Sequence, residues 1–215
     1  MAIESMGIIP DGTRRWARRE QVSLFTGYRH ASANLAKHVE ALSQREVRHI
    51  HIYIFSIYNL KRDPEEVRAC LDAACEFIVE LMASQRCIYV SGDIDTISRT
   101  HKRIAEVIMG IPACHANNGE TAIHLYIGYS FLQHLESVLR NEPSISSIIS
   151  TLTRRKLDLV IRTGDAITLS DFLPIESRYS QLYFLPTLFN DLSVSELMAL
   201  CDQYERTFPR LKYGE

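Results

Sequence analysis

A carboxylate, a glycine and a pair of arginines follow the first apolar run of the chain. The run MGIIP leads directly into Asp11, Gly12, Thr13, Arg14 and Arg15. Glycine lets the backbone approach a ligand closely, and arginine recognises phosphate oxygens through paired hydrogen bonds. A carboxylate beside such a site would repel phosphate unless a divalent cation lay between them, and Mg²⁺ commonly binds through one or two carboxylates plus substrate phosphates. The segment therefore predicts a phosphate site that uses Mg²⁺, with a plain Asp-Gly turn before an exposed basic helix face as the alternative.

Two further polar segments follow apolar runs in the same way. Arg162 and Gly164 come directly after LDLVI, and the end of the run HIHIYIFS leads into a segment that supplies Ser56, Asn59 and Arg62. The carboxyl ends of parallel strands meet at one edge of a sheet, where ligands of α/β proteins bind. Three polar segments at one sheet edge favour a phosphate-rich active site over three unrelated turns.

Apolar runs of strand length alternate with longer amphipathic stretches along the whole chain. Such alternation is typical of βαβ units with right-handed crossovers, so we expect a single α/β domain over residues 1–215. Its core would be a mostly parallel central β-sheet of about six strands flanked by helices. The predicted strands are residues 6–10, 49–56, 87–92, 121–130, 157–165 and 180–188, and the predicted helices are residues 29–47, 65–84, 96–110 and 193–208, with a helical region near 130–153.

The composition excludes several classes of protein. A formal net charge of -2 at pH 7 argues against general nucleic-acid binding, which needs a broadly basic face. No apolar run is long enough to span a bilayer, and the first residues lack the features of a secretory signal, so we expect a cytoplasmic protein with no integral membrane segment. The five cysteines form no CxxC pair, and we expect all of them to be reduced; they are Cys70, Cys75, Cys87, Cys114 and Cys201.

The histidines and short catalytic motifs indicate no other chemistry. The sequence contains no HExxH or other metal spacing, no GxSxG elbow, no Walker A sequence and no GxGxxG fingerprint. His49, His51 and His124 fall on predicted strands, where we expect hydrogen-bonded structural histidines.

Taken together, the three polar segments resemble the cis-prenyltransferases, the undecaprenyl diphosphate synthase family. The family pattern D-G-N-G-R-W-A is similar to DGTRRWA at residues 11–17, and F-S-x-E-N-W-x-R is similar to FSIYNLKR at residues 55–62. The late block of D-L-x-I-R-T-G-G, R-x-S-N-F-L and E-L-Y-F resembles residues 158–184. The order and spacing of the three blocks agree over nearly the whole chain.

The resemblance implies a Mg²⁺-dependent prenyltransferase that acts as a homodimer on allylic diphosphates. The allylic donor would bind at the glycine-containing segment, and the acceptor, usually isopentenyl diphosphate, would bind beside it. Asp11 would be the metal ligand and, with Asn59, a catalytic residue. The implied substrate-binding residues are Gly12, Thr13, Arg14, Arg15, Ser56, Tyr58, Arg62, Arg162, Thr168 and Ser170. The ending RLKYG at residues 210–214 is similar to a family R-x-G ending that reaches the partner's active site.

The sequence departs from the family pattern around both substrates. On the donor side, Thr13 and Arg14 replace asparagine and glycine, and Tyr58 replaces a glutamate. On the acceptor side, Thr168 stands where the second arginine of the R-x-S clamp belongs, and Gln181 replaces the glutamate of E-L-Y-F that helps to hold the metal. We therefore expect a weakened isopentenyl diphosphate site.

Bulky side chains also occur on segments that wall the product tunnel in the family. They argue against a long polyprenyl product, and they are Ile54, Ile57, Tyr58, Phe77 and Met82.

These departures resemble the irregular-terpene branch of the family, the lavandulyl and cyclolavandulyl diphosphate synthases. Members of that branch join two dimethylallyl diphosphates head-to-middle, and this reaction is our first hypothesis. The retained Arg162 and Ser170 leave open a regular short-chain enzyme that uses isopentenyl diphosphate to make neryl or Z,Z-farnesyl diphosphate. A non-catalytic partner subunit of a long-chain prenyltransferase is the third hypothesis, and the intact Asp11 and Gly12 disfavour it.

Overall fold

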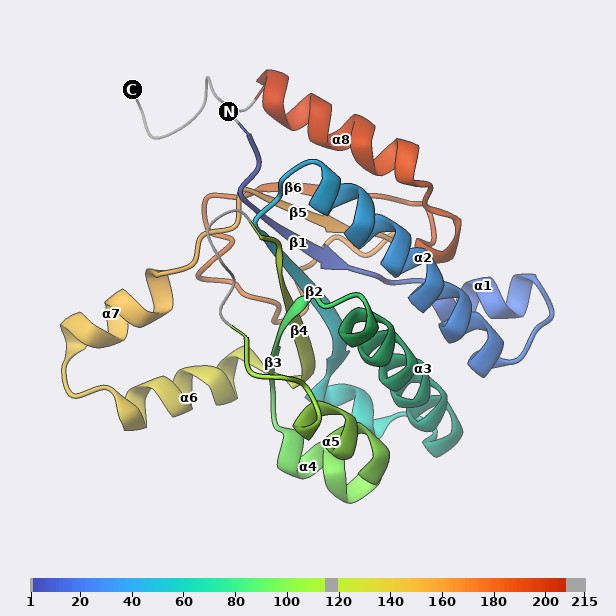
Figure 1. Ribbon diagram of the computed structural model, residues 1–215, viewed down its shortest axis with the longest axis horizontal. Coiled ribbons are helices and arrows are strands. Elements are labelled where there is room, and N and C mark those ends of the chain that lie inside the picture. The colour runs from blue at the N-terminus through green and yellow to red at the C-terminus, as the bar shows by residue number, and fades with distance from the viewer. Residues whose placement is uncertain (1, 115–119, 208–215) are drawn as a thin grey trace.

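A single parallel sheet organises the chain. The computed structural model describes residues 2–114 and 120–207. Among these residues, six strands pair in the order β3-β4-β2-β1-β5-β6, and every pairing is parallel (Figure 1). The predicted α/β domain with a mostly parallel sheet is therefore confirmed. The strands are β1 (Ser5–Ile9), β2 (His49–Ser56), β3 (Cys87–Ser91), β4 (Ala122–Tyr129), β5 (Leu159–Arg162) and β6 (Gln181–Phe184).

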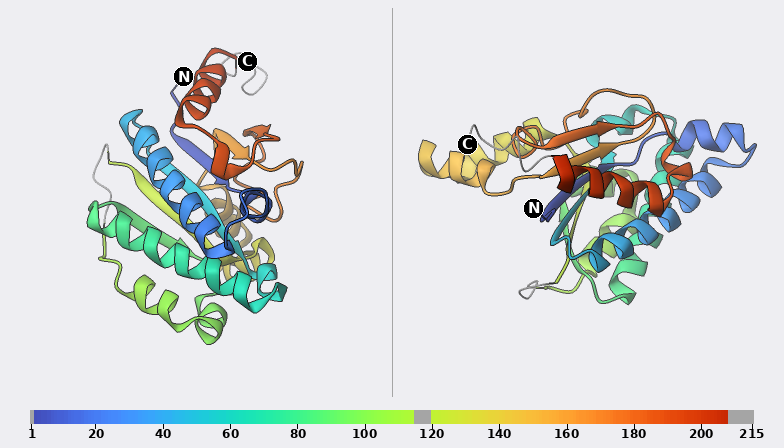
Figure 2. Two further views of the ribbon diagram at one scale, coloured as in Figure 1. Left: turned by 90° about the vertical axis from the view of Figure 1, so that its right-hand side faces the viewer. Right: turned by 90° about the horizontal axis from the view of Figure 1, so that it is seen from above.

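The larger hydrophobic core lies on one face of this sheet. Alternate residues of the central strands, such as Ile50 and Ile52, point to this face and are fully buried. The helices α2 (Leu24–Gln44), α3 (Pro64–Ala83) and α8 (Val194–Thr207) bury their apolar sides against them. Figures 1 and 2 show α2 and α3 lying side by side across the sheet. The helix α2 comes after β1 in the chain, and α3 comes after β2. The packing of these two helices on the sheet therefore fixes the position of the polar segments that follow the strands.

A smaller aromatic core covers the other face. Tyr53 and Tyr126 on the strands pack against Phe172, which lies in the irregular segment between β5 and β6. The helices α6 (Phe131–Asn141) and α7 (Ile145–Thr153) pack on each other and project from this side as a hairpin (Figure 1). An irregular segment rather than a helix therefore lies over the part of the sheet nearest the candidate site.

Two predicted helical regions are each divided in the structure. Residues 96–110 form α4 (Ile94–Thr100) and α5 (Lys102–Met109), because His101 adopts an extended conformation. The Nδ1 atom of His101 accepts the backbone N–H of Ile104, and Nε2 lies 3.1 Å from a carboxylate oxygen of Asp72 on α3. The side chain of His101 thus starts the second helix and anchors the break. In the later region, α6 and α7 are separated by a short link, and Ser144 forms a capping box with Ser147.

The expectation of five reduced cysteines is wrong. Cys87, at the start of the edge strand β3, forms a disulfide with Cys114, and the two Cα atoms lie 5.6 Å apart. Cys70, Cys75 and Cys201 are free and buried. Disulfide pairing depends on spatial distance, and residue spacing alone did not reveal that the segment after α5 returns to the edge of the sheet. Within the described residues, no helix is both long enough and apolar enough to cross a membrane.

Candidate active site

The carboxyl ends of β1, β2 and β5 bring the three polar segments together. The sheet order places β1 between β2 and β5, and Ile9 at the end of β1 pairs with Arg162 at the end of β5. A cavity of about 760 Å³ opens at this edge. Every predicted site residue lines it except Thr168, whose hydroxyl lies one hydrogen bond behind Arg162. The sheet therefore brings the predicted site residues together at one edge.

The loop that carries Asp11 and Gly12 is held in place by contacts with the segment just before α8. Gly12 has a φ of 110°, and a Cβ at this position would lie 3.1 Å from the Cα of Leu188. The backbone N–H of Phe189 donates to the carbonyl of Asp11, and the Thr13 hydroxyl donates to the side-chain oxygen of the buried Asn190. Only glycine combines this backbone conformation with this close approach. The position of the loop therefore depends on a segment about 180 residues away in sequence.

The short helix α1 (Thr13–Arg19) is anchored along the side opposite the cavity. The indole N–H of Trp16 donates to Asp191, and the guanidinium of Arg19 forms two hydrogen bonds with the same carboxylate, at 2.8 and 2.7 Å. The indole ring also stacks on His30 of α2. These contacts leave Arg14, Arg15 and Arg18 on the side of α1 that lines the cavity.

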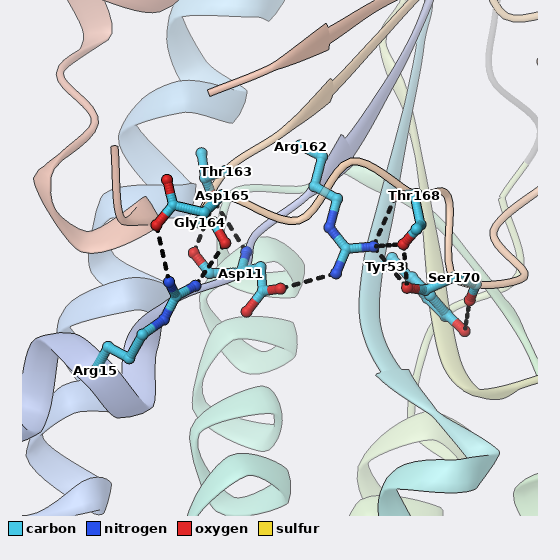
Figure 3. Close-up of polar contacts among 9 residues, drawn as sticks. All are labelled: Asp11, Arg15, Tyr53, Arg162, Thr163, Gly164, Asp165, Thr168 and Ser170. Atoms are coloured by element: carbon cyan, nitrogen blue, oxygen red, sulfur yellow. Dashed lines mark hydrogen bonds and ion pairs between the residues drawn. The ribbon is translucent and has the colours of Figure 1, made fainter. Parts of the chain in front are cut away.

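Arg162 is the most strongly held charged group of the site, and only 8% of it is exposed. Its Nη1 atom donates to the backbone carbonyl and hydroxyl of Thr168 and to the hydroxyl of Ser170, the last at 2.6 Å. Its Nη2 atom donates to Oδ2 of Asp11 at 2.8 Å (Figure 3). Arg162 therefore already has a partner on each of its two terminal nitrogens before any substrate binds.

Arg15 is turned toward the loop after β5. Its Nη2 atom donates to the carbonyl of Gly164 at 2.6 Å, and Nη1 lies 3.1 Å from the carboxylate of Asp165 (Figure 3). Gly164 has a φ of 80°, and a Cβ there would lie 2.6 Å from this guanidinium. The Thr163 hydroxyl accepts the backbone N–H of Asp11 and donates to its carbonyl. These contacts join the Asp11 loop to the loop after β5.

Arg14 and Arg62 face the cavity from another direction and share one carboxylate. Arg62 Nη1 donates to Oε1 of Glu66 at 2.9 Å, and Arg14 Nε lies 3.4 Å from the same oxygen. The sequence analysis did not identify Glu66, which lies in the first turn of α3. Its spacing of four residues from Arg62 was the signal that would have suggested the pair.

Apolar and aromatic side chains form part of the cavity wall. They include Tyr28, Tyr53, Ile54, Tyr58 and Cys70. Sequence reasoning missed Tyr28, Tyr53 and Cys70, because no pattern showed that α2, β2 and α3 present these side chains to one space. Burial raises the pKa of the Tyr53 phenol and of the Cys70 thiol to about 12, so both groups are protonated near neutral pH.

Three of the five bulky side chains that were expected to wall a tunnel do not line the cavity. Phe77 is fully buried in the main core and Met82 packs against that core. Neither contributes to the cavity wall, and nor does Ile57. Phe77 and Met82 therefore belong to the hydrophobic core and not to the cavity lining.

Gln181 lies far from the cavity of its own chain. It is the first residue of β6 and pairs with Leu159, whereas Arg162 at the cavity pairs with Phe184 at the other end of the same strand. Its side-chain oxygen is buried and has no hydrogen-bond partner in the described part of the chain. Replacement of a glutamate by Gln181 therefore changes nothing in the cavity that this chain forms by itself.

Asp11 fits the expected ligand of Mg²⁺. Its side chain is 38% exposed to the cavity, and Oδ2 is held by Arg162. Oδ1 accepts no hydrogen bond from residues 2–114 or 120–207. One carboxylate that keeps a free oxygen suits an ion that takes its other ligands from water and substrate phosphates. In the same residues, no group of three or more histidine, cysteine or acidic side chains could hold a metal by itself.

The strand histidines form a separate structural cluster. His51 Nδ1 lies 2.9 Å from the Tyr126 hydroxyl, and His49 Nδ1 lies 3.2 Å from Nε2 of His124. Burial lowers the pKa of His124 to about 3 and holds that of His51 well below its usual value. The contacts agree with the expectation of neutral, hydrogen-bonded side chains.

The structure is thus that of an α/β protein with a wholly parallel sheet, whose carboxyl edge carries a cavity lined by arginines and by Asp11 and Asp171. The family model described as "Putative undecaprenyl diphosphate synthase" matches residues 9–212, so the chain belongs to this family, the cis-prenyltransferases. The resemblance drawn from the sequence is thereby confirmed, and the chain is a prenyltransferase by family.

Individual relatives are distant but similar over most of their length. A tritrans,polycis-undecaprenyl-diphosphate synthase (geranylgeranyl-diphosphate specific) of Thermococcus kodakarensis is 26% identical, with 94% of this chain and 83% of that protein covered. An isoprenyl transferase of Streptococcus pneumoniae is 27% identical, with 95% and 90% covered.

Solved structures show the same fold. The lavandulyl diphosphate synthase of Lavandula x intermedia, crystallised in complex with dimethylallyl diphosphate, superposes with a TM-score of 0.77 at 20% identity, and 99% of this chain and 97% of that chain are covered. A probable undecaprenyl diphosphate synthase from Campylobacter jejuni superposes with a TM-score of 0.70 at 19% identity, with 97% and 99% covered.

Proposed function

We propose that this chain condenses two molecules of dimethylallyl diphosphate head-to-middle and releases diphosphate. The product is a branched or cyclic C10 diphosphate, of the lavandulyl or cyclolavandulyl type. The observation that carries the proposal is the composition of one cavity. One part of its lining holds Asp11 and several arginines, and another part includes Tyr28, Ile54 and Cys70. Such a cavity suits a diphosphate on a short prenyl chain.

The donor diphosphate binds against Arg14, Arg15, Arg18 and Arg62, which line the same cavity as Asp11. Asp11 would hold Mg²⁺ through its free carboxylate oxygen. When bound, this ion neutralises charge on the diphosphate as it leaves. The arginines act on the same oxygens, and charge-assisted hydrogen bonds strengthen as negative charge develops on the acceptor. The chain therefore lowers the barrier to breaking the C–O bond of the donor.

The carbon–carbon bond forms on the apolar side of the cavity. The electron pair of the breaking C–O bond leaves with the diphosphate, and the allylic carbon is attacked by the internal alkene carbon of the second dimethylallyl diphosphate. The resulting tertiary cation loses a proton, either directly or after closing a ring. The phenol of Tyr53 is protonated near neutral pH, because burial raises its pKa to about 12, so Tyr53 does not take this proton. We propose that the released diphosphate accepts it.

The hydrogen bonds of Arg162 support irregular coupling over the regular reaction with isopentenyl diphosphate. Arg162 is the retained arginine of the acceptor clamp, and Thr168, Ser170 and Asp11 already occupy its terminal nitrogens. With threonine at position 168, the clamp has one arginine instead of two. The second candidate function is regular coupling with isopentenyl diphosphate, which is left open because Arg162 and Ser170 are both retained at their family positions.

We also propose that the enzyme is a homodimer. The hairpin of α6 and α7 supports this proposal, because it projects from the body and exposes large apolar side chains, namely Leu132, Leu139, Ile145 and Ile149. Size-exclusion chromatography with light scattering should give twice the mass of the chain. The ending at residues 210–214 lies outside the described residues.

A product assay tests the proposed reaction. Purified protein receives Mg²⁺ and dimethylallyl diphosphate alone, and then the same with isopentenyl diphosphate. A C10 alcohol after phosphatase treatment of the first mixture supports irregular coupling, and its retention and mass spectrum show whether a ring has closed. Product only in the second mixture would establish the regular reaction. Absence of diphosphate release in both mixtures would favour the non-catalytic partner subunit.

A further inference from the structure

Two arginines of the cavity converge on one buried carboxylate behind its wall. Glu66, in the first turn of α3, is only 7% exposed. Its Oε1 atom accepts a hydrogen bond from Arg62 at 2.9 Å and from the Tyr28 hydroxyl at 3.4 Å, and it lies 3.4 Å from Nε of Arg14. Arg14, Arg62 and Tyr28 line the cavity, whereas Glu66 does not.

We infer that Glu66 is a positioning residue for the diphosphate, acting through Arg62 and Arg14. The inference rests on the proposed function, because it assumes that these two arginines bind the donor diphosphate. Glu66 makes no contact with the ligand itself. It holds the two guanidinium groups beside each other and aimed into the cavity before substrate binds.

The electrostatic reason is that two guanidinium groups in one wall repel each other. A carboxylate between them offsets the repulsion and supplies charge-assisted hydrogen bonds. Arg62 is held more firmly, through a short contact to a residue four positions further along the chain. Arg14 touches the carboxylate only through Nε, and among the described residues its two terminal nitrogens have no hydrogen-bond partner. The two terminal nitrogens of Arg14 are therefore available to a ligand, whereas Arg62 is held in place by Glu66.

The shared carboxylate matters more here because Arg14 stands where the family pattern has glycine. A glycine needs no counter-charge, so the contact between Arg14 and Glu66 is a property of this chain. Without Glu66, the extra arginine would add positive charge to the wall but no defined geometry.

Three roles for Glu66 lead to different results when its charge is removed. If Glu66 acted only as a negative charge behind the site, Glu66→Gln would strengthen diphosphate binding. If Glu66 only stabilised the fold, the variant would lose thermal stability and leave binding unchanged at a temperature where it is folded. If Glu66 positions the arginines, the folded variant binds diphosphate more weakly.

The test is calorimetric titration of the whole chain with inorganic pyrophosphate in the presence of Mg²⁺. We expect Glu66→Gln to raise the Kd by about 10-fold, as expected for loss of a hydrogen bond to a charged group. The matched control is Glu65→Gln, which removes the same charge one residue earlier from an exposed position. Its Kd should stay within about 2-fold of the wild type. In an Arg62→Ala background, Glu66→Gln should change the Kd less than in the wild type, because the residue through which it acts is absent.

Steady-state kinetics with dimethylallyl diphosphate gives a second measurement. We expect kcat of Glu66→Gln to fall by more than KM rises, because the arginines act most strongly on the charge of the departing diphosphate. Glu66→Asp keeps the charge but withdraws it by about 1.5 Å, so it should behave like the glutamine variant. The aspartate variant also serves if the glutamine variant does not fold.

Binding equal to or tighter than that of the wild type in both Glu66 variants would overturn the inference. So would equal losses in the wild-type and Arg62→Ala backgrounds. These results differ from failure of the proposed function, in which the wild type itself would not bind pyrophosphate.

Discussion

The pair formed by Asp11 and Arg162 gives the sharpest test of the mechanism. We expect Asp11→Asn to remove turnover while the fold survives. The substituted side chain keeps its shape, but it loses the charge that pairs with Arg162 at 2.8 Å and the oxygen proposed to hold Mg²⁺. Arg162 keeps its contacts to Thr168 and Ser170, so the guanidinium stays hydrogen-bonded.

The expected loss of stability is small because the pair is only partly buried. The side chains of Arg162 and Asp11 are 9% and 38% exposed, between the fully buried and fully exposed cases. Breaking such a pair costs about 1–2 kcal/mol, which lowers the Tm of a chain of this size by about 2–8 °C. The loss of activity should be much larger. Metal-assisted charge stabilisation supplies several kcal/mol, so we expect kcat to fall by about 1,000-fold.

Diphosphate release measures the activity, and a thermal melt on the same preparation measures the stability. The control is Asp165→Asn, which removes another carboxylate paired with an arginine at the same sheet edge, at 3.1 Å and mostly exposed. We expect this control to keep activity within about 3-fold and its Tm within about 2 °C of the wild type. Retention of more than about a tenth of the activity in Asp11→Asn would remove Asp11 from the mechanism.

Three further predictions concern the acceptor site, the histidine cluster and the disulfide. Thr168→Arg should lower the KM for isopentenyl diphosphate by about 10-fold, because a second arginine adds charge-assisted contacts to the acceptor clamp. An unchanged acceptor preference in competition assays would contradict this account of the clamp. The wild type should lose stability as the pH falls from about 6.5 toward 3, because burial lowers the pKa of His124 to about 3 and protons then bind the unfolded chain preferentially. Urea unfolding of His124→Gln should show a smaller pH dependence over this window, and an identical slope would mean that other groups cause it. Reduction of the bond between Cys87 and Cys114, which are separated by 27 positions, should lower the free energy of unfolding by about 3 kcal/mol. Urea unfolding with and without dithiothreitol measures this effect, and a Cys87→Ser variant that still responds to reductant would refute it.

The strand ends were predictable from sequence because strand and loop signals are local. Apolar runs followed by polar residues marked the ends of β1, β2 and β5, with a glycine after β1 and β5, and the parallel arrangement then placed those ends at one edge. Sequence alone therefore indicated Asp11, Arg62 and Arg162. It needed only residue types, their order, and the rule that parallel strands finish on the same side.

Contacts between distant segments could not be predicted in the same way. The spacing of Arg62 and Glu66 could suggest one ion pair, but Arg14 reaches the same carboxylate only because α1 and the start of α3 lie close together, and local patterns contain no such information. Gln181 is an example in the opposite direction. A family motif indicated a position near the metal, but the register of β6 places Gln181 at the end of that strand away from the cavity of its own chain. The disulfide of Cys87 also depends on a return of the chain that spacing does not reveal.

The sequence by itself determined the fold class, the family and the residue types available at one sheet edge. These properties follow from hydrophobic periodicity and from short motifs, both of which depend only on residues that are close together in sequence. Only the tertiary structure decided which charges pair, which arginines keep free nitrogens and where the apolar wall ends. Those outcomes depend on distances of a few ångströms between segments as far apart as Asp11 and Arg162, and packing of the whole sheet sets such distances.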